Sequence, residues 1–239
     1  MRVLITRPIA DAQPLAELLE TGGVASMIDP LLDIQYLDGD EIELDNTQGL
    51  LVTSANGIRA FALRSQNRDI RAWTVGDASA RATSELGFTH VKSASGDVET
   101  LAKLVINHAD TADGALLHVA GTRLAGDLGG QLEAAGFIYN RVVLYEAKTS
   151  TALSPETCLA LQEGTLDGVV LYSPKTAAIF RQLIEQQALQ AVMKSLTVFC
   201  LSPAVAAKVS DLDWKQVAIA SSVIENGLVE DIFRAAQAT

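Results

Sequence analysis

Leu50-Leu-Val-Thr-Ser54, followed by the amphipathic stretch from Ala55 to Phe61, has a counterpart later in the chain. Val169-Val-Leu-Tyr-Ser173 is followed by Pro174 to Phe180, and Ser54 and Ser173 are 119 residues apart. The next unit repeats as well, because the ten residues from Trp73 resemble the ten residues from Phe199 at a spacing of 126. Each copy reads as a short apolar strand, a small polar turn and a helix.

A third pair of segments begins at Val3 and at Leu117, and places Gly22 and Gly136 at equivalent helix ends, 114 residues apart. The spacings 114, 119 and 126 differ as they would if loop insertions separated two copies of one half. We therefore predict two similar lobes, and clefts between lobes are common binding places for small molecules.

Short apolar runs alternate with helical patterns along the whole chain. Three of the helical patterns end at a glycine expected to cap the helix, Gly22, Gly87 and Gly136. This alternation predicts an α/β fold in which each lobe is a five-stranded parallel sheet flanked by helices. The expected strands are 3–6, 25–29, 49–53, 72–75, 89–91, 115–119, 138–144, 168–172, 197–201 and 217–220.

Two segments interrupt the alternation and read as linkers. Tyr36 to Gln48 is acidic, and Lys148 to Glu156 is rich in threonine and serine. If the chain crosses between lobes at both, residues 1–35 and 150–239 form a discontinuous lobe 1, residues 40–147 form lobe 2, and 36–39 and 148–149 are the crossings. A double crossing is a hinge, which favours motion of the lobes.

Composition excludes several classes of protein. Hydrophobic residues make up 49% and charged residues 20%, which excludes disorder, and no run approaches the ~20 apolar residues of a membrane span. The first residues do not resemble a signal peptide, and two cysteines suit a reduced compartment, so we expect a cytoplasmic protein. A net charge of −11 without a basic cluster argues against nucleic-acid binding, although a local anion site remains open.

Small, hydroxylated or basic residues follow the expected strands. In open parallel sheets, ligands bind beyond the carboxyl ends of the strands, where helix N-termini attract carboxylates and phosphates. We expect an anion-binding surface there, although Ser54, Ser173 and Ser202 are also ordinary helix N-caps. The candidate binding residues are Thr6, Arg7, Ser54, Asn56, Gly76, Ser79, Gly121, Arg123, Ser173, Lys175, Thr176 and Ser202.

Motifs for cofactor, metal and covalent chemistry are missing. There is no GxGxxG turn after the first strand, no GxxxxGK[ST] loop and no GxSxG context around Ser54. His90, His108 and His118 are scattered without metal-ligand spacing, and His118 is expected to be a packed core residue. We therefore expect no cofactor and no metal.

Tyr145 ends the apolar run that begins at Val142, where lobe 2 meets the second linker. With an ordinary pKa near 10, its hydroxyl is a neutral hydrogen-bond donor at pH 7. Tyr145 is therefore a candidate hydrogen-bond donor to a ligand, and the alternative is a half-buried tyrosine at a strand end with a solvated hydroxyl.

The succession of these turns resembles the uroporphyrinogen-III synthase family over essentially the whole chain. No single motif is specific, but their order and spacings are. The matching segments are Val3-Leu-Ile-Thr-Arg-Pro8, Thr53-Ser-Ala-Asn-Gly57, Val75-Gly-Asp-Ala-Ser79, Leu144-Tyr-Glu146, Tyr172-Ser-Pro-Lys-Thr176 and Leu201-Ser-Pro203.

The resemblance implies two α/β lobes joined by a two-stranded linker, and a cofactor-free lyase of tetrapyrrole (haem) biosynthesis. Such an enzyme cyclises hydroxymethylbilane, a linear tetrapyrrole with eight carboxylates, with loss of water and inversion of the last pyrrole. The proposed route passes through an azafulvene cation and a spiro intermediate. The family's favoured assistant to hydroxyl departure matches Tyr145, and we expect a monomer that binds neither nucleic acid nor membrane.

One turn departs from the family pattern. In some relatives threonines follow the turn that matches Ser202-Pro203, whereas Ala204 and Val205 follow here, so only backbone contacts to substrate are expected at this place. The main alternative function is a non-catalytic two-lobed protein that binds or senses a small anion, since fold does not fix function. A regulatory domain of a larger protein is a further alternative.

Overall fold

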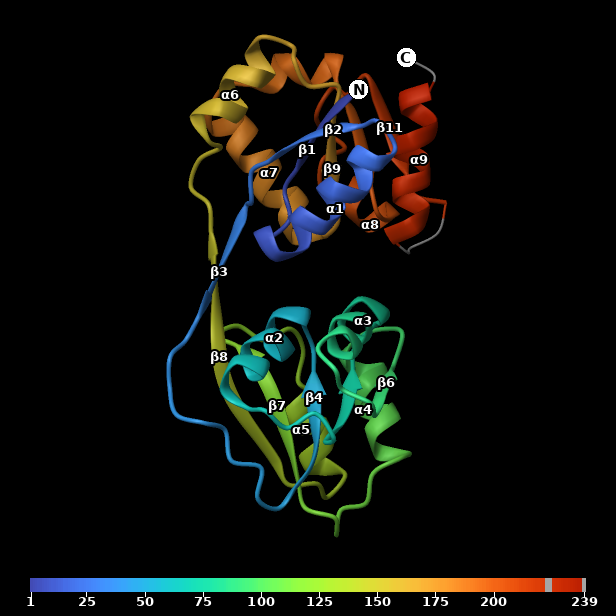
Figure 1. Ribbon diagram of the computed structural model, residues 1–239. Coiled ribbons are helices and arrows are strands. Elements are labelled where there is room, and N and C mark those ends of the chain that lie inside the picture. The colour runs from blue at the N-terminus through green and yellow to red at the C-terminus, as the bar shows by residue number, and fades with distance from the viewer. Residues whose placement is uncertain (222–224, 238–239) are drawn as a thin grey trace. The chain divides into compact units, whose positions relative to one another are not determined.

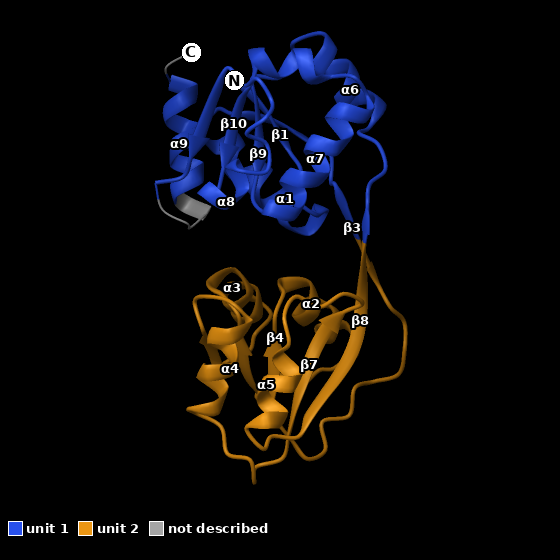
Figure 2. Cartoon of the chain, turned by 180° about the vertical axis from the view of Figure 1, so that it is seen from behind, with its two compact units in different colours: residues 1–33, 148–239 blue, residues 34–147 orange. Residues whose placement is uncertain are grey.

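The computed structural model, which describes residues 1–221 and 225–237, divides into two compact units (Figures 1 and 2). Unit 1 comprises Met1–Asp33 with Lys148–Thr239, and unit 2 comprises Ile34–Ala147. The chain passes between the units twice, along strands β3 and β8, as the change of colour in Figure 2 shows.

Unit 1 is built on a five-stranded parallel sheet in the order β11-β10-β9-β1-β2. Its central strands are continuous apolar runs, and β9 is buried at all four residues, as expected when helices cover both faces. The strands are Arg2–Ile5 (β1), Ala25–Ile28 (β2), Gly168–Leu171 (β9), Thr197–Cys200 (β10) and Gln216–Ile219 (β11).

Helices cover both faces of the unit 1 sheet. The core on one face joins α1 to α9, and the core on the other face joins α6, α7, η1 and α8. These helices are α1 (Ile9–Thr21), α6 (Pro155–Gln162), α7 (Pro174–Gln186), the 3-10 helix η1 (Gln190–Ser195), α8 (Pro203–Ala206) and α9 (Glu225–Gln237).

Unit 2 is built on a six-stranded sheet in the order β3-β8-β7-β4-β5-β6. One core packs α2 and α3 on one face, and the other packs α4 and α5 on the opposite face. The elements are β3 (Leu32–Tyr36), β4 (Thr47–Val52), α2 (Ala55–Arg64), β5 (Arg71–Thr74), α3 (Asp77–Glu85), β6 (Val91–Ser93), α4 (Val98–Ile106), β7 (Ala115–Gly121), α5 (Leu128–Ala134) and β8 (Tyr139–Thr149).

The two sheets confirm the internal repeat. Read from matching edges, their orders are β11-β10-β9-β1-β2 and β6-β5-β4-β7-β8. The strands paired by the sequence repeat, β4 with β9, β5 with β10 and β7 with β1, therefore occupy equivalent positions. The prediction of similar parallel α/β lobes is confirmed by this topology.

The prediction of five strands per lobe misses β3, which adds a sixth strand to the second sheet. The Ser150 amide donates to the Leu31 carbonyl (3.1 Å) and the Leu37 amide donates to the Leu144 carbonyl (2.9 Å), so β3 runs antiparallel to β8. Leu32–Tyr36 was not expected as a strand because it is short and mixes apolar and polar residues. Its stability as a strand comes from pairing with β8.

Two of the three predicted glycine caps adopt the left-handed conformation that favours glycine. Gly87 and Gly136 follow α3 and α5 with φ of 92° and 90°. Gly22 has φ of −91°, and the left-handed position belongs to Gly23 at φ 74°. Gly22 is instead constrained by space, because a Cβ there would overlap the ring of Phe233 in α9.

Candidate active site

Each sheet has one switch point, where consecutive crossovers leave in opposite directions along the sheet. Most candidate residues follow the two strands that border it, and Gly76, Ser79 and Ser202 follow the next strand of each sheet. In unit 2 the chain leaves β4 towards β5 and leaves β7 towards β8, so the divergence lies between β4 and β7. In unit 1 it lies between β9 and β1. Ligands of open α/β sheets bind at such switch points.

The turn after β4 is a helix N-cap held close to β7. The Ser54 hydroxyl accepts from the Asn56 amide (3.2 Å), and the Asn56 side chain accepts from Arg59 (3.5 Å). Gly57 lies against the Val119 carbonyl so closely that a Cβ would overlap the carbonyl oxygen. Ser54 and Asn56 therefore sit half-buried at the switch point, with the start of α2 fixed against β7.

Tyr145 and Gly121 are brought into direct contact across neighbouring strands. They are register partners after an irregularity in the pairing of β7 with β8, and the Thr122 amide donates to the Tyr145 carbonyl (3.0 Å). A Cβ on Gly121 would lie 2.7 Å from Cζ of the Tyr145 ring, so this ring packs over the glycine backbone. Among the described residues, the Tyr145 hydroxyl has no hydrogen-bond partner, and the side chain is half-buried.

The helix N-terminus expected beyond β7 does not follow the strand directly. β7 ends at Gly121, and α5 begins only at Leu128, where Asp127 caps it by accepting from the Gly130 amide (2.9 Å). Arg123 therefore lies in an exposed loop and not at a helix start. A glycine-rich sequence with a capping aspartate delays the helix to the first residue after that cap.

The carboxylate of Asp77 lies just beyond the end of β5. Asp77, in the first turn of α3, accepts hydrogen bonds from Ser93 (2.7 Å) and Ser95 (2.8 Å), and these bonds hold the pKa of its carboxyl below the ordinary value. Ser79 is buried within α3, next to Thr83. Gly76 and Ser79 thus lie beside a fixed negative charge, which disfavours a second anion there.

Three side chains in unit 2 form a series of hydrogen bonds that was not predicted. His118 is 2% exposed and contacts two hydroxyls, Thr53 Oγ1 at its Nε2 (2.8 Å) and the Tyr139 hydroxyl at its Nδ1 (2.7 Å). Burial, with a smaller contribution from Arg141, lowers the pKa of His118 to about 4, so the ring is neutral at pH 7. The prediction of a packed core histidine is confirmed, and these hydrogen bonds join the residue after β4 to the interior of β7 and the first residue of β8.

In unit 1, the turn after β1 is only partly accessible. Thr6 is fully buried and its hydroxyl donates to the Val170 carbonyl of β9 (3.1 Å), so its hydroxyl is committed to the sheet. The guanidinium of Arg7 lies 4.1 Å from the centroid of the Tyr172 ring and 3.9 Å from the Asp11 carboxylate. Arg7 is therefore fixed over the switch point of unit 1.

The serines after β9 and β10 differ in their roles. Ser173 caps α7 by accepting from the Thr176 amide (3.1 Å), and its hydroxyl also meets the Thr176 hydroxyl (2.7 Å). Lys175, between them, is exposed, whereas Thr176 is 5% exposed. Ser202 precedes α8 without a side-chain cap bond. The ordinary capping interpretation thus applies to Ser54 and Ser173, and not to Ser202.

Residues 1–221 and 225–237 contain no group of three or more histidine, cysteine, aspartate or glutamate residues arranged to hold a metal ion. Within the same ranges, no helix is both long and apolar enough to cross a bilayer.

Comparison with known proteins agrees with the observed fold. A family model described as uroporphyrinogen-III synthase HemD matches residues 13–230. The uroporphyrinogen-III synthetase structure from Helicobacter pylori 26695 is 14% identical with a TM-score of 0.61, over 98% of this chain and 100% of that chain. A mutant uroporphyrinogen III synthase from the extremely thermophilic bacterium Thermus thermophilus is also 14% identical, with a TM-score of 0.53 over 100% of both chains.

At this identity the two structures support the fold alone, and no curated protein sequence matches the chain. The family match carries the identification, because it spans most of the sequence and includes every turn described above except the one after β1. The chain therefore belongs to the uroporphyrinogen-III synthase HemD family.

Proposed function

We propose that this protein carries out the reaction of its family, cyclisation of hydroxymethylbilane to uroporphyrinogen III with loss of water and inversion of the last pyrrole, with Tyr145 assisting departure of the hydroxyl. The observation that carries this assignment of Tyr145 is its packing on Gly121 beside the switch point of unit 2. Its hydroxyl is left without a hydrogen-bond partner among the described residues, and so can donate to substrate.

Tyr145 would act on the carbon–oxygen bond of the terminal hydroxymethyl group. As this bond breaks, its electron pair leaves with the oxygen and the pyrrole nitrogen supplies electrons, which gives an azafulvene cation. A hydrogen bond or proton from Tyr145 stabilises the leaving oxygen, which departs as water. After ring closure, the proton released as the attacked pyrrole regains its aromaticity replaces the proton that Tyr145 gave to the leaving oxygen.

The remaining residues would bind carboxylates and shape the bilane. Hydroxymethylbilane ionises with little help, so the protein has mainly to position it and stabilise charge. The burial of Thr6, Ser79 and Thr176 and the carboxylate beside Gly76 count against direct roles for these four. The proposed substrate contacts are Ser54, Asn56, Gly121 and Arg123 in unit 2, and Arg7, Ser173, Lys175 and Ser202 in unit 1.

We also propose the cellular location of the protein, the absence of a nucleic-acid partner and the oligomeric state. A cytoplasmic location is supported by two cysteines that form no disulfide, Cys158 and Cys200. The absence of a nucleic-acid partner is supported by the net charge of −11. A monomeric state is proposed from the family resemblance, and sedimentation analysis tests it.

Replacing Tyr145 by phenylalanine tests the catalytic assignment. We expect Tyr145→Phe to lower kcat about ten-fold to a hundred-fold, through loss of one donated hydrogen bond or proton, with KM nearly unchanged. The melting temperature should stay unchanged because the hydroxyl bonds to no described residue. A variant with wild-type kcat would remove Tyr145 from the mechanism.

A further inference from the structure

Arg141 is a cation of β8 that reaches the carboxyl end of β7. It is the register partner of His118, three residues before β7 ends. Its Nη2 donates to the carbonyls of Gly121 (2.6 Å) and Thr122 (3.1 Å). The guanidinium is thereby fixed at the last residue of β7 and the first residue of the following loop.

The same two residues hold Tyr145. The Tyr145 ring packs over Gly121, and the Thr122 amide donates to the Tyr145 carbonyl. Arg141 and Tyr145 lie four residues apart on one strand and are tied to one dipeptide through different groups. The position of Arg141 is therefore coupled to that of the candidate catalytic residue.

Arg141 forms no ion pair within the described part of the protein. No carboxylate of the described residues lies within 4 Å of its nitrogens, and the side chain is exposed. Neighbouring His118 is neutral, and the carboxylates that act with Arg141 on the pKa of Tyr139, those of Asp127 and Glu133, form no ion pair with it. Among the described residues, the guanidinium is held by two backbone carbonyls.

A guanidinium has five N–H groups, and the two carbonyls engage only those of Nη2. The hydrogens of Nε and Nη1 remain, on different edges of the guanidinium, and either edge can give a carboxylate a single charge-assisted hydrogen bond. Lysine would supply the charge without the planar group that bonds two carbonyls and keeps further donors in fixed directions.

We propose that Arg141 binds a carboxylate of the tetrapyrrole substrate and, through Gly121 and Thr122, holds that carboxylate at a fixed distance from Tyr145. This inference rests on the proposed function, since it takes its ligand class from the octacarboxylate substrate. It adds a residue that lies inside a strand, where no binding residue was expected.

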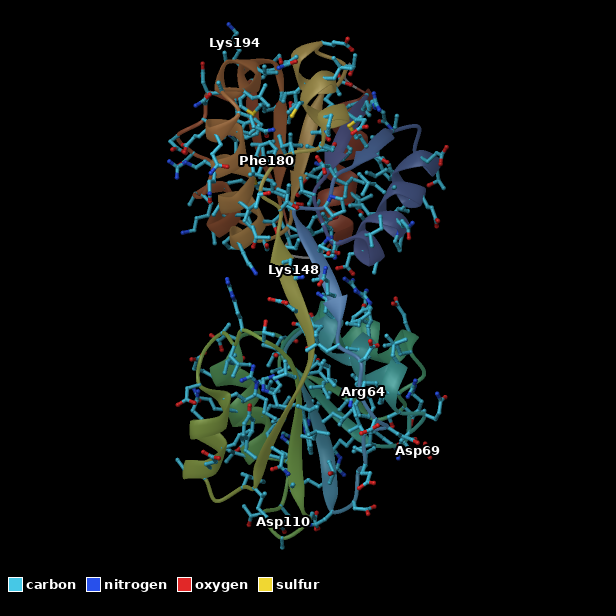
Figure 3. All side chains as sticks on the ribbon, turned by 90° about the vertical axis from the view of Figure 1, so that its left-hand side faces the viewer. Arg64, Asp69, Asp110, Lys148, Phe180 and Lys194 are labelled. Carbon is cyan, nitrogen blue, oxygen red and sulfur yellow. The ribbon has the colours of Figure 1, made fainter. Side chains whose placement is uncertain are left out.

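The test compares Arg141→Gln and Arg141→Lys with a matched control, Arg64→Gln. Arg64, labelled in Figure 3, also belongs to unit 2 and also donates to a backbone carbonyl, that of Asp40 (2.9 and 2.7 Å). It lies at the carboxyl end of α2, and α2 returns from the carboxyl end of β4 towards the start of β5. Its loss should therefore not change substrate binding.

Two readouts are measured on each full-length variant: KM for enzymatically generated hydroxymethylbilane, and the dissociation constant of uroporphyrin III, an octacarboxylate, by fluorescence titration. We expect Arg141→Gln to raise both KM and the dissociation constant about ten-fold, because one charge-assisted hydrogen bond is lost. Its melting temperature should be like that of Arg64→Gln. Arg141→Lys should fall between Arg141→Gln and wild type. The dissociation constant of Arg141→Gln, which lacks the charge, should depend less steeply on salt than that of wild type.

Equal constants for wild type, Arg141→Gln and Arg64→Gln would overturn the inference. So would an Arg141→Lys variant with wild-type constants if Arg141→Gln fails to fold, because the fixed donors of the guanidinium would then be dispensable. Formation of isomer III by wild type is scored separately, so a failure of this inference is distinguished from a failure of the proposed function.

Discussion

Acidification should destabilise unit 2 through one buried histidine. His118 packs among β4, β7 and β8, where it contacts Thr53 and Tyr139 and lies near the Arg141 charge. Its pKa falls from an ordinary value of 6.5 to about 4 in the folded protein, first because of burial and second because of Arg141. Between these two values the unfolded chain binds a proton that the folded chain does not.

The sign and size of the effect follow from this difference. Because the folded pKa is depressed, stability is complete above about pH 6.5, is lost as pH falls, and levels off near pH 4. One pKa unit corresponds to about 1.4 kcal/mol, so the free energy of unfolding should drop by about 2.5 kcal/mol between pH 7 and pH 4.5. The lowered pKa values of Asp77 and Asp97 act at lower pH, because the ordinary value of both is 3.8.

The assay is urea unfolding of unit 2 at a series of pH values, followed by tryptophan emission. Trp73 is buried in the unit 2 core, and Trp214 belongs to unit 1, so a Trp214→Phe background reports unit 2 alone. The matched variant is His118→Gln, whose amide can donate and accept but does not titrate. An equal pH slope with and without His118, or a flat profile for the parent, would refute the reasoning.

Two further predictions concern the turns at the switch points. Gly57→Ala should destabilise unit 2 by about 2 kcal/mol in urea unfolding, because the new Cβ would overlap the Val119 carbonyl oxygen; unchanged stability would mean that α2 can shift away from β7. Ser173→Ala should cost unit 1 about 1 kcal/mol through loss of the cap to Thr176, while Ser202→Ala should change stability by less than about 0.5 kcal/mol. Equal losses for the two serine variants would contradict the assignment of their roles.

The repeat and the parallel topology were predictable because they follow from local patterns. A fully buried strand such as β9 is a continuous apolar run, and a helix end such as Gly136 needs a left-handed residue. β3 was not predictable in this way, because its pairing with β8 joins residues more than a hundred positions apart, as between Leu31 and Ser150.

The site was predictable only in outline. Sequence places Ser54, Gly121 and Ser173 at strand ends, and the structure finds them there. It does not reveal which hydroxyls are already engaged, so the committed hydroxyl of Thr6 could not be recognised. Arg141 was missed because it lies inside β8, and only the length of its side chain brings the guanidinium to the end of β7.

The most direct test of the account is the identity of the porphyrin that the protein makes. Hydroxymethylbilane is generated in a coupled assay, the protein is added, and the products are oxidised and resolved by chromatography into isomers I and III. Without an enzyme the bilane closes to the uninverted isomer I. The account predicts predominant isomer III with wild type, and isomer I forming at the rate seen without protein would contradict it and favour a binding or sensing protein.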